Sequence, residues 1–289
     1  MRHLLFRVTR VPLTIGVLWA AFAVLSPIAM ARYGPFVLAP GIGVGTRGQS
    51  PFGGPQIAVP TVAQAYQSSL ADVIVAATGR SLALLAGVLV FSLTVGLLLG
   101  ITAALLRRRA IQSGVILGLT SVVAAVPSFF LAYFLQILII FIGGAAGRTV
   151  LPVFGFGLDG HLVLPLLALS APAVAMTAQL TAVRMGEVFD ADFVNTANAK
   201  GLLPSWIVRV HILPHVLPLS LEAVGSGLRV AVSSLPIVEY LLLWNGIGFV
   251  ALQSIALRDP AAFAACGVVL AALFSLASLL LDLRPRHFG

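Results

Sequence analysis

Six long apolar stretches, separated by short polar segments, dominate the chain. An α-helix rises 1.5 Å per residue, so about 20 apolar residues are needed to cross a hydrocarbon layer about 30 Å thick. The predicted spans cover residues 11–31, 82–106, 115–142, 162–183, 216–243 and 261–281. The sequence has no segments of the alternating apolar and polar type that build a membrane β-barrel. The pattern therefore predicts an all-α integral membrane protein with six transmembrane helices.

Three of these spans contain a proline, namely Pro127, Pro172 and Pro236. A membrane helix tolerates proline when neighbouring helices or water satisfy the carbonyl that loses its partner. Each of the three stretches is therefore predicted to be one span.

The first apolar stretch allows two interpretations. Arg2, Arg7 and Arg10 precede it, and it ends in the small residues of positions 29–31, which resembles a cleavable signal peptide. Its length of about 20 residues exceeds the 7–15 of a signal-peptide core, which favours a retained anchoring helix.

Composition supports the membrane assignment. The 289 residues are 60% hydrophobic and 9% charged, and the mean hydropathy is +1.08. A soluble domain has about 25% charged residues, so a soluble globular enzyme is excluded. The net charge of +8 comes from scattered basic residues, whereas a nucleic-acid site gathers them on one face. The single cysteine, Cys266, lies in an apolar stretch, which excludes disulfides and thiolate metal clusters.

The basic residues predict the orientation. With six spans both termini lie on one side, which holds eleven of the 17 basic residues, while the other side holds five and Arg229 lies within a span. The eleven are Arg2, Arg7, Arg10, Arg107, Arg108, Arg109, Arg184, Lys200, Arg209, Arg284 and Arg286. Cytoplasmic loops carry the excess of Lys and Arg, so both termini are predicted to be cytoplasmic.

Two loops differ from the rest. Outside, residues 32–80 are rich in Gly and Pro as far as Pro60, and residues 61–78 are predicted to form one amphipathic helix on or near the membrane surface. Inside, loop 184–215 has the highest density of such polar residues in the chain, with Glu187, Asp190, Asp192, Asn195, Asn198 and Lys200. The chain is accordingly divided into residues 1–81, the first helix with the outer segment, and residues 82–289, a five-helix core that carries this loop.

The inner loop has signs of internal order. Residues 192–200 are small and polar and predict a short helix, which Gly201 ends. Pro204 and Ser205 then start a second helix, because proline favours the first helical position. We predict a compact cytoplasmic knob of two short helices, whose small side chains allow another protein's backbone to approach closely. The alternative is a merely solvated connection.

The knob also resembles a known family. Residues 196–202 read TANAKGL, and Leu213-Pro214 begins twelve residues after Gly201. This arrangement resembles the signature loop of ABC-importer permeases, in the form found in the first permease subunit of dipeptide, oligopeptide and nickel importers. Asn195 and Thr196 stand where the wider family has an acidic residue and alanine.

The resemblance extends over residues 82–289. Further matches are Val238-Glu239, Trp244, Gly246-Ile247-Gly248, Arg258-Asp259-Pro260 and residues 280–286. The family usually has proline where this chain has Asn245, and the outer segment 32–78 is a poor match.

The resemblance implies a type I ABC-importer permease fold in a bacterial inner membrane. Such a subunit forms half of the translocation pathway for di- or oligopeptides or a related solute. Its implied partners are a second homologous permease, cytoplasmic ATP-binding subunits and an extracytoplasmic solute-binding protein. The ATPase-coupling residues implied are Thr196, Ala197, Ala199, Lys200, Gly201, Leu202, Leu213 and Pro214.

No cofactor is expected on this chain, and ATP and Mg would bind the partner ATPase subunits. The only lysine, Lys200, precedes Gly201, so the chain lacks the G-x-x-x-x-G-K-[ST] loop that ATP hydrolysis of this type requires. A non-catalytic subunit is therefore expected.

The fifth span carries charged residues that need an explanation. Glu222 and Arg229 are seven residues apart, so they share a helix face at about 10 Å. A charge at mid-membrane costs about 2.5–3.5 kcal/mol on insertion scales, so both should face the bundle, a partner or water. They either line the translocation pathway or its gate, or make inter-subunit hydrogen bonds. Glu239, near the outer end, allows the same two interpretations.

A second function class uses the same pair. A stand-alone, ion-coupled secondary transporter would couple through Glu222 and Arg229. Such transporters often contain internal repeats, and the two halves of this sequence show no convincing repeat.

Two weaker patterns favour structural roles. His211 and His215 have a metal-ligand spacing, but Pro214 lies between them and the H-E-x-x-H pattern is missing. The glycines of Gly96-x-x-x-Gly100, Gly114-x-x-x-Gly118 and Gly225-Ser226-Gly227 predict close helix packing.

Overall fold

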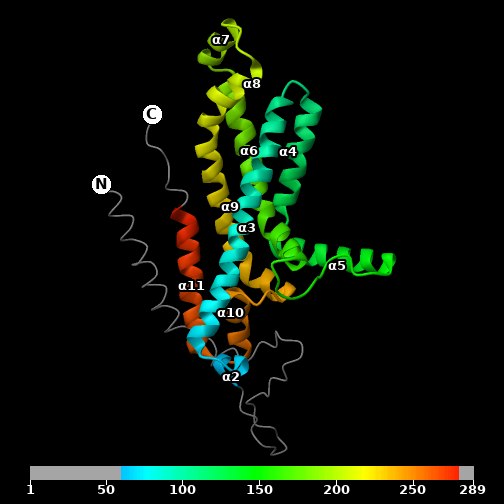
Figure 1. The fold of residues 1–289 in the computed structure, drawn as a ribbon, viewed down its shortest axis with the longest axis vertical. Helices are drawn as coiled ribbons and strands as arrows, with labels where there is room; N and C mark the ends of the chain where they lie inside the picture. The colour runs from blue at the N-terminus through cyan, green and yellow to red at the C-terminus, as the bar shows by residue number, and fades with distance from the viewer. Residues whose placement is uncertain (1–59, 280–289) are drawn as a thin grey trace, which may run out of the picture. The chain divides into compact units, whose positions relative to one another are not determined.

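The computed structural model describes residues 60–279, and the regular structure within this range is helical throughout (Figure 1). The predicted first span, 11–31, its signal-peptide alternative and both chain termini lie outside the described residues. The α-helices are α2 (Val62–Tyr66), α3 (Leu70–Leu105), α4 (Ala110–Ala125), α5 (Ser128–Ala146), α6 (Val163–Phe189), α7 (Asp192–Ala199), α8 (Pro204–Trp206), α9 (Leu213–Leu242), α10 (Ile247–Ala256) and α11 (Pro260–Leu279). A 3-10 turn, Gly160–Leu162, precedes α6, and a π-helical segment, Ile207–Ile212, precedes α9.

Within the described range, five helical stretches are long and apolar enough to cross a membrane. They are Leu70–Leu105, Ser128–Ala146, Gly160–Phe189, Pro204–Leu242 and Pro260–Ser278. The prediction of an all-α chain built from membrane-spanning helices is therefore confirmed for this part of the chain.

The predicted single span at 115–142 is wrong, because the chain breaks at Val126-Pro127 into α4 and α5. The proline ring disfavours the helical conformation of the residue before it, and Val126 is extended, with φ −82° and ψ 126°. Figure 1 shows α5 pointing away from α4 instead of continuing it. Pro172 and Pro236, in contrast, remain inside α6 and α9, as predicted.

The predicted single amphipathic helix at 61–78 is also wrong. Thr61 and Gln64 form a capping box that starts α2, but Gln67 ends this helix after five residues in the left-handed conformation, with φ 52°. The long helix α3 then begins at Leu70, and the Ser69 hydroxyl accepts a hydrogen bond from the Asp72 N–H at its first turn.

The described residues fall into two compact units. One comprises residues 60–83, 154–156 and 235–275, and the other comprises residues 84–153, 157–234 and 276–279. This division follows packing, whereas the boundary predicted between residues 81 and 82 follows membrane topology and stays a prediction.

Close helix packing in the second unit depends on glycine. A Cβ on Gly96 would lie 2.6 Å from the Thr177 Cβ, and a Cβ on Gly100 would lie 2.6 Å from the Ala178 carbonyl oxygen. A Cβ on Gly227 would overlap the Ala173 backbone. Packing roles for these three glycines are therefore confirmed. Gly114 and Gly118 have no neighbouring atom within 4 Å, so the packing prediction for that pair has no counterpart among residues 60–279.

Candidate functional site

The predicted knob is built on a well-defined helix end. Helix α7 stops at Lys200, and Gly201 follows with φ +73°, a left-handed conformation that glycine adopts without a steric penalty. The Leu202 N–H donates to the Ala197 carbonyl at 3.3 Å, and the Gly201 N–H donates to the Asn198 carbonyl at 2.9 Å. These two bonds form a Schellman motif, which satisfies carbonyls that a helix end otherwise leaves unpaired. The predicted helix 192–200 and its glycine stop are confirmed.

The second predicted short helix does not remain separate. Pro204 occupies the first turn of α8 as predicted, but α8 continues through the π-helical segment into α9, so the helical path runs from Pro204 to Leu242. In an ordinary α-helix the ring of Pro214 would clash with the carbonyl of Val210. The wider π-helical turn immediately before Leu213 relieves this crowding.

A small apolar core anchors the knob to three long helices. Its buried members come from the ends of α3 and α6, from α7, and from the path that leads into α9: Ala104, Met185, Val194, Ala197, Ile207, Ile212 and Val216. Ala197 is only 6% exposed, so this predicted coupling residue holds the knob together from within. Because α7 packs on the long helices through this core, a force on the knob reaches them through direct contact.

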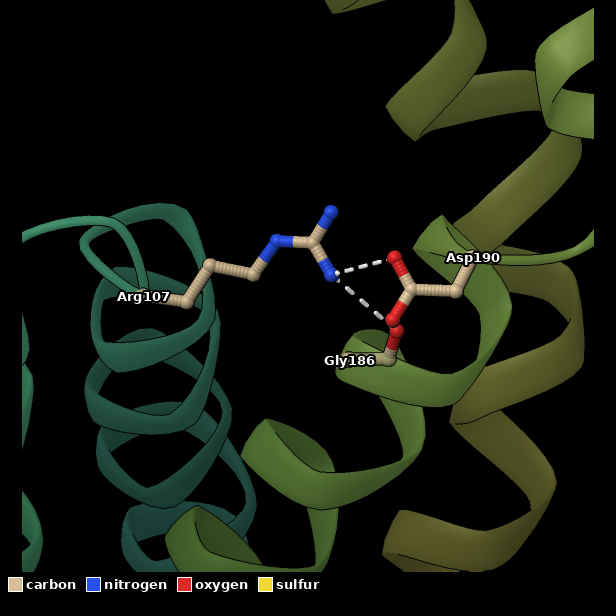
Figure 2. Close-up of polar contacts among 3 residues, drawn as sticks. All are labelled: Arg107, Gly186 and Asp190. Carbon is tan, nitrogen blue, oxygen red and sulfur yellow. Dashed lines mark hydrogen bonds and ion pairs between the residues drawn. The ribbon is translucent and has the colours of Figure 1, made fainter.

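An ion pair joins the turn that follows α3 to the C-terminal end of α6 (Figure 2). The Arg107 guanidinium donates to the Asp190 carboxylate at 3.0 Å and to the Gly186 carbonyl at 3.3 Å, and it lies 4.7 Å from the centre of the Phe189 ring. Asp190 caps the end of α6, two residues before α7 begins. The two side chains are 37% and 73% exposed, so the pair contributes at most about 1 kcal/mol and mainly fixes an orientation.

The outer face of the knob combines small, basic and apolar side chains. Thr196, Ala199, Lys200, Gly201 and Leu202 are exposed, as a contact surface requires. Of the two remaining predicted residues, Leu213 is half-buried and Pro214 is exposed.

Sequence reasoning left two large apolar side chains out of the predicted site. Leu203 is 70% exposed and Trp206 is 54% exposed. Exposed apolar residues grouped on a surface mark protein contacts. The signal that could have found them is their position between Gly201 and the start of α9, where a purely solvated loop would carry polar residues.

The paired histidines lie at the base of the knob. The His215 ring lies 5.5 Å from the Phe193 ring, measured between centroids. Among the described residues, no group of three or more His, Cys, Asp and Glu side chains is arranged to hold a metal ion.

The three acidic and basic residues predicted for the pathway lie in two different environments. Glu222 and Arg229 are half-buried on α9 within the second unit. Glu239 lies in the first unit, where its side chain is 0% exposed and accepts three hydrogen bonds, from the Ser81 hydroxyl at 2.5 Å, the Gly248 N–H at 2.8 Å and the Phe249 N–H at 3.1 Å.

A helical membrane chain that presents an ordered, partly apolar knob between two of its spans has the features of a transporter permease. The chain belongs to the family of binding-protein-dependent transport system inner membrane components, whose pattern matches residues 96–288. It is thus a multi-pass inner-membrane permease subunit of the ABC-importer class, as the resemblance of its knob predicted.

Three relatives illustrate the range of the family. A candidate peptide permease protein of Brucella suis biovar 1 is 26% identical over 229 residues, which are 76% of this chain and 70% of the relative. The dipeptide transport system permease protein DppB of Bacillus subtilis is 30% identical over 171 residues, 59% of this chain and 54% of the relative. The glutathione transport system permease protein GsiC of Shigella flexneri serotype 5b is 29% identical over 174 residues, again 59% and 54%.

Proposed function

We propose that this chain forms half of the translocation pathway of an ATP-driven importer for di- or oligopeptides or closely related solutes. The proposal for the solute rests on relatives that are named for peptide, dipeptide and glutathione transport. The second half of the pathway is a homologous permease, and an extracytoplasmic binding protein delivers the solute. In this arrangement the chain is non-catalytic, and ATP and Mg bind to partner subunits.

The proposed topology has six spans with both termini in the cytoplasm. Five helical stretches of suitable length and the predicted first span make up the six. The excess of basic residues favours a cytoplasmic position for the knob and for the Arg107–Asp190 pair.

The knob is the proposed docking element for the cytoplasmic ATPase. The observation that carries this proposal is the division of α7 into two faces. Val194 and Ala197 are buried in the core of the knob, whereas Thr196, Ala199 and Lys200 are exposed. Small exposed side chains permit close approach, and the neighbouring Leu203 and Trp206 offer apolar area to a groove.

Mechanical coupling then follows from the packing. When the ATPase subunits close, they displace the knob as a rigid body, and its buried core passes the displacement to α3, α6 and α9. Half-buried Glu222 and Arg229 on α9 are the proposed polar residues of the pathway or its gate. The ion-coupled alternative assigns the same two residues to an ion site, but membership of the importer family favours ATP-driven transport.

A matched pair of leucines tests the docking proposal. Leu203 on the knob is 70% exposed, and Leu158, in the loop between α5 and α6, is 71% exposed. In mild detergent, a tag on this chain should co-purify an ATP-binding subunit from the wild type and from Leu158→Glu, while Leu203→Glu should lose most of it. Equal recovery with both variants would place the ATPase contact elsewhere. Transport by the purified chain alone, driven by an ion gradient without ATP, would support the alternative.

A further inference from the structure

The path of α9 is broken at its far end by a turn that contains a buried tryptophan. Helix α9 ends at Leu242 and α10 begins at Ile247, and the turn between them contains two residues in the left-handed conformation, Leu243 and Asn245, both with φ 54°. Trp244, inside the turn, is 0% exposed. Gly246, Ile247 and Gly248, which follow it, are also buried, so their backbone polar groups must be satisfied within the protein.

Asn245 explains how this chain forms the turn. Position 245 has φ 54°, a conformation that proline, fixed near φ −65°, cannot adopt. Asparagine adopts the left-handed conformation more readily than most residues. The turn observed here is therefore compatible with this chain's own residue at position 245 and incompatible with proline.

The carboxylate of Glu239 satisfies the start of α10. One carboxylate oxygen accepts the N–H groups of Gly248 and Phe249, and the other accepts the Ser81 hydroxyl proton. The Ser81 oxygen in turn accepts the Ile247 N–H at 2.8 Å. The N-cap residue of α10, Gly246, has no side chain that could do this, so Glu239 and Ser81 together cap the helix from α9 and α3.

The network packs tightly against the Gly246 backbone. A Cβ on Gly246 would overlap the Glu239 carboxylate and the Ser81 hydroxyl, so the absence of a side chain at position 246 is required. Arg80, next to Ser81, donates to the Asn245 carbonyl at 3.1 Å and so holds the turn to α3 as well. A negative charge at a helix N-terminus is favourable, and three donors compensate the burial of this carboxylate.

We propose that Glu239 is a positioning residue that locks α10 and the outer end of α3 to α9, so that these three helices move together in the transport cycle. The proposal rests on the proposed importer function. The reason for the proposal is that α9 is one continuous helix, which begins beside the knob at Leu213 and ends at Leu242, three residues after Glu239. A displacement of the knob reaches α10 only if the turn after Leu242 holds its shape. The Glu239–Ser81 network holds the start of α10, and the Arg80 contact with Asn245 supports the turn beside it. Because Glu239 is fully buried and hydrogen-bonded, the proposed role acts on transport through the position of α10.

Three variants and one control separate this role from a general effect on folding. Glu239→Ala removes the carboxylate, and Ser81→Ala removes one of its partners. Glu239→Gln loses the charge, but its amide can accept the two N–H groups and donate to Ser81, so it serves as the conservative rescue. Ser233→Ala is the control on the same helix, because the Ser233 hydroxyl is exposed and donates only to the Arg229 carbonyl of its own helix.

The experiment uses the whole transporter, purified through a tag on this chain and reconstituted in proteoliposomes with its binding protein. Uptake of tritiated dialanine and ATP hydrolysis are measured in the same vesicles, and hydrogen–deuterium exchange is followed for residues 246–257. For Glu239→Ala we expect uptake per ATP to fall about tenfold or more, hydrolysis to stay within about twofold of wild type, and exchange at the start of α10 to rise about tenfold. Glu239→Gln should regain at least half of the uptake per ATP, Ser81→Ala should lie between, and Ser233→Ala should match the wild type.

Several results would contradict the proposed positioning role of Glu239. Wild-type uptake per ATP or wild-type exchange in Glu239→Ala would do so, as would a parallel loss of uptake and hydrolysis that Glu239→Gln does not rescue. If Glu239→Ala fails to assemble, Ser81→Ala is the deciding variant. Wild-type hydrogen–deuterium exchange in α10 together with wild-type uptake per ATP in Ser81→Ala would contradict the proposal. A wild-type complex that hydrolyses no ATP and imports no dialanine would count against the proposed function. The hydrogen–deuterium exchange of residues 246–257 would still test whether Glu239 holds α10 in place.

Discussion

Replacing Gly100 by alanine is expected to destabilise the packing of α3, whereas the same change at Gly118 is not. A Cβ on Gly100 would lie 2.6 Å from both the Ala178 carbonyl oxygen and the Thr181 Cβ, and ordinary contacts begin near 3.4 Å. One of these groups must therefore move. Thr181 also shares a buried hydrogen bond of 2.8 Å with Ser220 of α9, so the displacement reaches a second helix contact.

The two substitutions together isolate the packing energy. Both gain about 0.8–1.0 kcal/mol of helix propensity, because alanine replaces glycine inside a helix. Only Gly100→Ala also overpacks an interior, which costs about 1–3 kcal/mol. The propensity gain cancels in the comparison, so Gly100→Ala should be less stable than Gly118→Ala by about 1–3 kcal/mol.

The buried cysteine provides the assay. Cys266 is the only cysteine of the chain and is 0% exposed, so a fluorescent maleimide should label this subunit only when it opens. At about 2–4 °C per kcal/mol for a chain of this size, the labelling midpoint of Gly100→Ala should lie about 2–12 °C below that of Gly118→Ala. A midpoint for Gly100→Ala that equals or exceeds the Gly118→Ala midpoint would refute the close contact.

Three further predictions concern the knob and α9. Gly201→Ala places a side chain at φ +73°, which costs about 1–2 kcal/mol, so this variant should co-purify less ATPase than the wild type. The control is Gly186→Ala, because a Cβ on Gly186 would meet no atom within 4 Å, and equal ATPase recovery with the two variants would contradict a rigid knob. Arg107→Ala and Asp190→Asn should each reduce uptake per ATP, and the double variant should lose no more than either single variant, because the two side chains form one contact. Fully additive losses in this double-mutant cycle would show that the two residues act independently. Glu222→Gln and Arg229→Gln should lower the uptake rate without changing the amount of assembled complex, and normal uptake in both would remove them from the pathway.

Local chemistry made much of the knob predictable. Gly201 and Pro204 are residues with strong conformational preferences, and they fix the end of α7 and the start of α8 where the sequence placed them. The spacing of Gly96, Gly100 and Gly227 likewise predicted close packing, which depends mainly on the absence of a side chain.

Contacts between residues far apart in the chain could not be predicted from the sequence alone. Arg107 and Asp190 are 83 positions apart, and Ser81 and Glu239 are 158 apart, so no local pattern indicates that they meet. Glu239 was expected either to line a pathway or to bond another subunit, which stays a prediction, and no sequence pattern indicated that its carboxylate caps a helix of its own chain. Pro127 shows a different difficulty, because the hydropathy of residues 115–142 is continuous while the backbone turns at Val126.

Photo-crosslinking can identify the protein that contacts the knob. A photo-reactive amino acid at Ala199, exposed on α7, would report what lies against the knob in the assembled transporter, and the same residue at Thr94, exposed on α3, would serve as the control. The expected result is that the probe at Ala199 captures an ATP-binding subunit and that the probe at Thr94 does not. Capture of lipid alone, or of no second polypeptide, at Ala199 would contradict it.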